Sequence, residues 1–251
     1  MISVKTVHEI ELMRRSGRAA ATALAVAGRA VKPGVTTAEL DRIVRRVLKE
    51  YGAKASFLGY GGFPAAACIS LNEEVIHGIP SDKRVVSEGD IVKLDVGAIV
   101  DGYHGDCADT FFAGDVAEGA IKLYEVTRQS FYEGIGDALV GKRIGDISRA
   151  IQDFVEQNGF SVVRSFVGHG IGKNLHEDPE VPNYGRAGHG YRLQAGYTLA
   201  IEPMVNEGVY AVKTLDDDWT VITVDSKLSC HYENTILVTD GQPEILTLPE
   251  V

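Results

Sequence analysis

Two aspartates stand on the two arms of a predicted β-hairpin. Residues 91–112 read as two apolar strands joined by Asp101-Gly102, a strong signal for a two-residue turn. Side chains alternate along a strand, and opposed residues share a face. Asp95 and Asp106 are therefore predicted to project from the same side of the hairpin as diagonal neighbours, with Cβ atoms roughly 7–8 Å apart.

The register of this hairpin follows from the turn. It predicts that Asp95 lies opposite Ala108 and Asp106 opposite Gly97. Two carboxylates on the inner side of an apolar hairpin repel each other and lose hydration, so a cation should lie between them, and a pair of divalent metals is the natural candidate. In the alternative interpretation, Asp95 caps a neighbouring loop and Asp106 is solvated near the turn.

The second half of the chain offers two more acids on predicted strands. Residues 196–202 (GYTLAIE) form a strand that ends at Pro203 and carries Glu202, and residues 229–238 (SCHYENTILV) form another that carries Glu233. The sequence thus predicts two acids from each half of the chain. Taken together, these four carboxylates favour the cation site over the solvated alternative.

Three of the seven histidines stand in sequences that suit a site. His169 lies in FVGHGIG, where glycines allow a ligand to approach the backbone, His176 follows in NLHEDP, and His77 ends an apolar run in VIHGIP. Taken singly, each is more often a hydrogen-bonded structural residue. No role is assigned to the other histidines, which are His8, His104, His189 and His231.

Four carboxylates and one imidazole form a hard, oxygen-rich ligand set. Such a set favours Mn, Fe(II), Co or Zn in a paired arrangement over a thiolate zinc site or a calcium loop. Two metals about 3.5–4 Å apart clamp a water, lower its pKa and polarise a carbonyl. The chemistry that this predicts is hydrolysis of an amide or an ester.

Helices must position these strands. Apolar residues at helical spacing predict helices over residues 6–31, 116–139 and 145–158. Thr36 and Glu39 form a capping box that opens a further helix.

A shift of 107 residues superposes features of the two halves. Gly141 then falls on Gly34 and Gly159 on Gly52, with apolar helix positions matching between them. This order suggests an internal duplication, in which each half supplies half of one central sheet and the helices cover its outer face.

The predicted fold class is therefore α+β. We expect a single catalytic domain over residues 1–251, built from pseudo-repeats of about 1–114 and 115–251. No linker rich in Pro, Gly or Ser divides the chain.

The composition limits the classes of protein to which the chain can belong. The 251 residues, 45% hydrophobic and 24% charged, are typical of a globular protein, and the net charge of −10 argues against nucleic acid or an anionic membrane as the main partner. Three widely separated cysteines predict reduced thiols rather than a disulfide framework. The N-terminal residues contain no secretory signal and no run long enough to span a bilayer, so we expect a cytoplasmic protein.

These motifs resemble type I methionine aminopeptidases of the bacterial kind, within the pita-bread metallopeptidase family. The resemblance covers essentially the whole chain. It implies a pita-bread fold, with pseudo-twofold helix-helix-strand halves around a curved antiparallel sheet. The segments that carry it are GYGGFPAAACISLNEEVIHGIP, VKLDVGAIVDGYHGDCADT, FVGHGIGKNLHEDPEVPNY, LAIEPMVN and WTVITVDSKLSCHYENTILVT.

The resemblance implies a role for each polar residue. Asp95 resembles the chelating ligand of one metal, Asp106 and Glu233 the bridging carboxylates, and His169 and Glu202 ligands of the other metal. Glu202 would also accept the proton of the attacking water. His176 would hold the scissile carbonyl and stabilise the oxyanion, and His77 would contact the amide nitrogen on the leaving side.

The resemblance also implies an adaptable apolar pocket for methionine. Its lining matches Tyr60, Phe63, Cys68 and Trp219, with Leu175 beside them, although Trp219 also suits an edge-strand core residue. Four positions that bear on pocket shape depart from relatives, which often carry a cysteine, a histidine, a cysteine and an aromatic residue there: Phe57, Gly61, Ile76 and Leu175.

The implied partners are nascent polypeptides and short peptides that begin with methionine, with a small second residue preferred. We expect a monomer that works near the ribosome, with no membrane partner and no direct nucleic-acid binding. The short interval between His176 and Glu202 leaves no room for the helical insertion of type II enzymes. The alternatives are an Xaa-Pro aminopeptidase and a metal-free binding protein on the same fold.

Overall fold

The predicted hairpin forms the middle of a long sheet in the computed structural model, which describes residues 2–250. Its arms are β4 (Ile91–Val100) and β5 (Tyr103–Phe112). Asp95 pairs with Ala108 and Gly97 with Asp106, so the register that the turn predicts is confirmed. Both aspartates therefore leave the same face of the hairpin.

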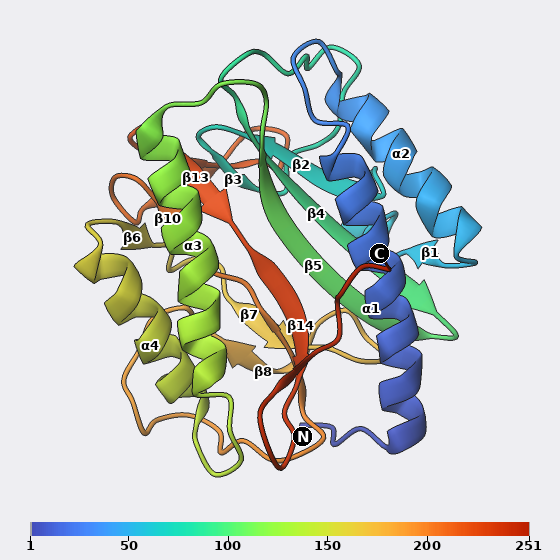
Figure 1. Ribbon diagram of the computed structural model, residues 1–251, viewed down its shortest axis with the longest axis vertical. Helices are drawn as coiled ribbons and strands as arrows, with labels where there is room; N and C mark the ends of the chain where they lie inside the picture. Colours follow the sequence, from blue (N-terminus) through green and yellow to red (C-terminus); the bar gives the residue numbers. More distant parts are fainter. Residues whose placement is uncertain (1, 251) are drawn as a thin grey trace.

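Strands from both halves of the chain join this sheet (Figure 1). Its order is β1-β4-β5-β14-β9-β7-β8, with β2 paired to β4 and β15 to β14. The first half supplies β1, β2, β4 and β5, and the halves meet where β14 pairs with β5. The matching halves of the sequence predict such a shared central sheet. The internal duplication itself stays a prediction. The bounds are β1 Lys54–Ala55, β2 Ala67–Leu71, β7 Gly168–Gly170, β8 Glu177–Val181, β9 Thr198–Ile201, β14 Glu233–Leu237 and β15 Glu244–Ile245.

The strand predicted over residues 229–238 is wrong as one continuous element. It divides at Tyr232 into β13 (Ser229–His231), which pairs with β10 (Met204–Asn206), and β14, which stays in the main sheet. The Tyr232 ring packs on Phe131 with ring centroids 5.3 Å apart, so burial of this ring accompanies the break in the ladder.

Short strands complete two smaller sheets. In one, β10 pairs with β13 and with β6 (Ser161–Val162); in the other, β12 (Val221–Thr223) pairs with β11 (Val212–Thr214) and with β3 (Glu74–Ile76).

Two helix pairs pack on the strands as the periodicity predicts. The first pair is α1 (Val7–Gly28) and α2 (Thr37–Glu50), with α1 against β4 and β5. The second is α3 (Glu118–Gly136) and α4 (Ile144–Gln157), with α3 against β10 and β13. Figure 1 shows both pairs in front of the strands that they contact. The capping box of Thr36 and Glu39 is confirmed, since each residue bonds the backbone N–H of the other.

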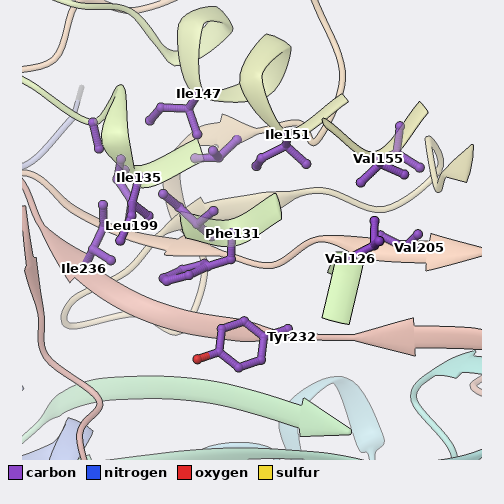
Figure 2. Close-up of a cluster of buried hydrophobic side chains, with 14 of the residues drawn as sticks. Val126, Phe131, Ile135, Ile147, Ile151, Val155, Leu199, Val205, Tyr232 and Ile236 are labelled. Carbon is purple, nitrogen blue, oxygen red and sulfur yellow. The ribbon is translucent and has the colours of Figure 1, made fainter. Parts of the chain in front are cut away.

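Apolar side chains of α3 and α4 interlock with strands of the second half. Figure 2 shows Phe131, Ile147 and Ile151 of the helices facing Leu199 and Ile236 of β9 and β14. All five are fully buried or nearly so, and this packing holds the strands rigidly where they carry acids. Among residues 2–250, no helix combines the length and the apolar composition needed to cross a bilayer.

Candidate active site

Three neighbouring strands bring acids onto one face of the sheet. Asp95 on β4 and Glu233 on β14 lie on either side of Ala108, because both pair with that residue of β5. Asp106 stands two residues before Ala108 and so shares its face. Because Ala108 contributes only a methyl group, the three carboxylates can converge above it.

The next strands add a histidine and a fourth acid. His169 on β7 pairs with Ala200 of β9, and Glu202 directly follows β9. The Asn183 side chain donates to the Glu202 carbonyl at 3.0 Å, which fixes the backbone where the strand ends. His169 Nδ1 lies 2.8 Å from the Gly170 carbonyl, so Nδ1 carries the proton and Nε2 stays free as an acceptor, 3.6 Å from Glu202 Oε1.

The geometry suits a metal ion. Ligand atoms of Asp106, His169 and Glu233 all lie within 4.8 Å of one another. Within the described residues, Asp95 Oδ1, Asp106 Oδ1 and Glu233 Oε1 are buried acceptors without a hydrogen-bond partner. Orphaned carboxylate oxygens of this kind are costly unless a cation satisfies them, so the residues present fit the predicted cofactor.

Sequence reasoning missed one residue near this cluster. His231 received no role, yet its Nε2 lies 3.9 Å from Glu202 Oε2 and 3.9 Å from Glu233 Oε2. The signal that could have found it is the alternation of side chains, since positions 231 and 233 share a face of an extended segment.

Burial dominates the electrostatics of the four acids. It raises the pKa of Asp106 to about 7, and it raises the pKa values of Asp95, Glu202 and Glu233 well above their ordinary range, with repulsion from Asp106 adding to each. Burial also lowers the pKa of His169 to about 3, so this imidazole is neutral at pH 7 and able to bind metal.

These shifts predict how the stability of the metal-free protein varies with pH. Between about pH 6.5 and pH 8, the buried acids lose protons that the unfolded chain has already lost, so the free energy of unfolding falls. Histidines with lowered pKa values act in the opposite direction over the lower part of this interval, because the unfolded chain still holds part of its histidine protons at pH 6.5. The contribution of the acids is therefore the difference between metal-free and metal-loaded protein. Relative to metal-loaded protein, we expect the melting temperature of EDTA-treated protein to fall by at least about 3 °C over this interval, or about 1 kcal/mol.

Calorimetry with and without Mn(II) measures this effect. Metal-loaded protein should lose the contribution of the acids, because the cation replaces the protons, and Asp106→Asn should reduce this contribution in metal-free protein. Identical slopes with and without metal would contradict this account of the cluster.

All the predicted site residues line one cavity of about 150 Å³. The carboxylates and His169 occupy one part of its wall, and apolar side chains form another. Cys68 lies opposite Asp95 across β2 and β4, and Phe63 contacts Trp219 edge-on with ring centroids 5.1 Å apart. The cavity is lined by Phe57, Tyr60, Phe63, Cys68, His77, Asp95, Asp106, His169, Leu175, His176, Glu202, Trp219 and Glu233.

The two remaining histidines stand at the edge of the carboxylate cluster. The His176 ring lies 4.2 Å from the ring of His169, and its Nδ1 lies 2.7 Å from Tyr60 Oη. His77 has φ +59°, a left-handed conformation uncommon for a side-chain-bearing residue, and its ring is 6.3 Å from that of Trp219. Burial lowers the pKa of His77 to about 4, so His77 is neutral at pH 7.

The four departures from the family pattern divide into two groups. Phe57 and Leu175 line the cavity, whereas Ile76 is buried in a separate cluster with Val163. Gly61 has φ +56°, and a Cβ there would lie 3.3 Å from the Trp219 ring. Only the first two therefore shape the cavity directly.

Comparisons with known proteins identify the family of this chain. Residues 11–240 match metallopeptidase family M24. A methionine aminopeptidase of Clostridium acetobutylicum is 56% identical over 250 residues, covering 100% of both chains. The crystal structure of a methionine aminopeptidase from Thermotoga maritima has a TM-score of 0.97 at 46% identity, covering 98% of this chain and 99% of that one. Prolidase from Pyrococcus furiosus has a TM-score of 0.80 at 22% identity over 99% of this chain and 66% of its own, which shows a shared fold alone.

Proposed function

Because the chain belongs to metallopeptidase family M24, and within it to the bacterial type I methionine aminopeptidases, we propose that it removes the initiator methionine from peptides and nascent proteins. The observation that carries the proposal is the convergence of unpartnered carboxylates and His169 on a cavity whose other wall is apolar. A polar cluster can activate water there, while the apolar wall accepts an unbranched thioether side chain.

The proposed cofactor is a pair of divalent ions, drawn from Co, Mn, Fe(II) or Zn. Asp95 would chelate one ion, Asp106 and Glu233 would bridge both, and His169 and Glu202 would hold the other. When bound, such ions lower the pKa of a water and polarise the scissile carbonyl.

The residues of the chain perform the remaining steps. A carboxylate oxygen of Glu202 accepts a proton from the attacking water. His176 donates a hydrogen bond to the carbonyl oxygen as it becomes an oxyanion, and His77 contacts the amide nitrogen on the leaving side. Neutral imidazoles suit these tasks, because they donate hydrogen bonds without adding positive charge beside the metals.

The apolar wall supports methionine as the first residue of the substrate. Tyr60, Phe63, Cys68 and Trp219 would surround its side chain, and a short second residue would be preferred. We further propose that the protein acts as a monomer in the cytoplasm close to the ribosome, without a membrane or nucleic-acid partner. Its three buried free cysteines support a reducing compartment.

Release of methionine from Met-Ala-Ser tests the proposal. EDTA-treated protein should be inactive, and added Mn(II) or Co(II) should restore release of free methionine, because the cluster needs cations to activate water. Leu-Ala-Ser and Ala-Pro-Ala serve as matched controls and should stay intact. Cleavage of Ala-Pro-Ala instead would favour an Xaa-Pro peptidase, and absence of both cleavage and metal binding would favour a binding protein.

A further inference from the structure

His231 lies on the buried side of the carboxylate cluster. Contacts of its neighbour Tyr232 and hydrogen bonds of its own backbone hold it there. Its neighbour Tyr232 packs away from the cluster, beneath α3, where its hydroxyl lies 3.2 Å from that of Tyr132. Figure 2 shows the Tyr232 ring against Phe131 in this core. Because adjacent residues of an extended segment point to opposite sides, this anchoring directs His231 and Glu233 toward the acids.

The backbone of His231 is also fixed. The His231 N–H donates to Thr110 Oγ1 at 3.2 Å, and Thr110 Oγ1 donates to the His231 carbonyl at 2.9 Å. The side chain is 2% exposed and is not among the described residues that line the cavity. The imidazole therefore approaches Glu202 and Glu233 from behind and cannot contact a substrate.

One ring nitrogen of His231 has no partner within residues 2–250. Its Nε2 is buried, without a hydrogen bond, and equidistant at 3.9 Å from a carboxylate oxygen of Glu202 and one of Glu233. A bare nitrogen lone pair facing two carboxylates would be repelled, whereas an N–H would be attracted. A hydrogen bond needs about 2.9 Å, so either carboxylate has to approach by only about 1 Å.

We propose that His231 is a positioning residue of the metal centre. Its Nε2–H donates to the carboxylates of Glu202 and Glu233 from the side away from the cavity and orients their other lone pairs toward the metal. The inference rests on the proposed function, since it presumes that these carboxylates bind metal. Donors of this kind behind metal ligands typically change metal affinity by about 10–100-fold when removed.

Two substitutions of His231 by residues of similar size distinguish hydrogen-bond donation from other roles of this side chain. His231→Leu fills the site without a donor, whereas His231→Gln keeps an amide N–H of similar reach. Titration calorimetry of EDTA-treated proteins with Mn(II) should show affinity about 10–100-fold weaker for His231→Leu and near wild type for His231→Gln. Unchanged affinity in His231→Leu would overturn the proposal, as would equal losses in both variants, which would indicate direct ligation or packing.

A second measurement tests the proposal on wild-type protein, and so does not depend on whether the leucine variant folds. In wild-type protein loaded with Zn(II), nitrogen-15 correlation spectra of the histidine rings should show a proton on Nε2 of His231. A proton on Nδ1 and a metal-shifted Nε2 would overturn the proposal by making His231 a ligand. If wild-type protein bound no metal at all, the proposed function itself would fail, which distinguishes the two outcomes.

Discussion

Glu202→Gln is expected to lower kcat for Met-Ala-Ser by about 10³-fold or more at saturating Mn(II), within the range of general-base catalysis. The amide keeps the shape of the carboxylate but cannot accept the proton of the attacking water. Glu202 directly follows β9 in the cavity wall, and its backbone is held by Asn183, so the substituted side chain should occupy the same place. The measurement is steady-state kinetics with metal content determined in the same samples.

Glu125→Gln is the matched control, because Glu125 is exposed on α3 and away from the cavity. It should leave kcat unchanged. Wild-type kcat in a metal-loaded Glu202→Gln protein would reject the role of Glu202 as the base. Loss of bound metal in that variant would instead assign the defect to its role as a ligand.

Local rules account for the parts of the site that the sequence predicted. The Asp101-Gly102 turn fixes the register of β4 and β5, so the diagonal placement of Asp95 and Asp106 needs no tertiary information. The predicted helices and strands indicate the α+β class, the motif resemblance adds the pita-bread fold, and the comparisons confirm both.

Long-range packing accounts for what the sequence did not predict. The break at Tyr232 accompanies the contact of this ring with Phe131, about a hundred residues earlier in the chain, and no local propensity predicts it. The position of His231 depends on the same contact. The hydrogen bond between Tyr60 and His176 likewise joins a short 3-10 helix (Tyr60–Gly62) to the residue before β8, and only the folded chain determines their approach.

His176→Ala is expected to lower kcat by about 10²–10³-fold, which is the usual cost of removing one oxyanion donor. Its affinity for Mn(II), measured by calorimetry, should stay near wild type, because the proposed ligands remain in place. His8→Ala is the control, since His8 is exposed in the first turn of α1. Loss of metal binding in His176→Ala would make His176 a ligand and contradict the proposed role.

The contact with Tyr60 sharpens this expectation. A phenol hydroxyl donates more readily than it accepts, so at 2.7 Å it favours a bare Nδ1 and a protonated Nε2 on His176. That tautomer is the one that can donate to an oxyanion from Nε2.

Tyr60→Phe keeps the ring that lines the cavity and removes only the hydroxyl. It should therefore lower kcat, by less than His176→Ala, and leave the KM for Met-Ala-Ser near wild type. A rise in KM at unchanged kcat would show that the hydroxyl serves substrate binding instead.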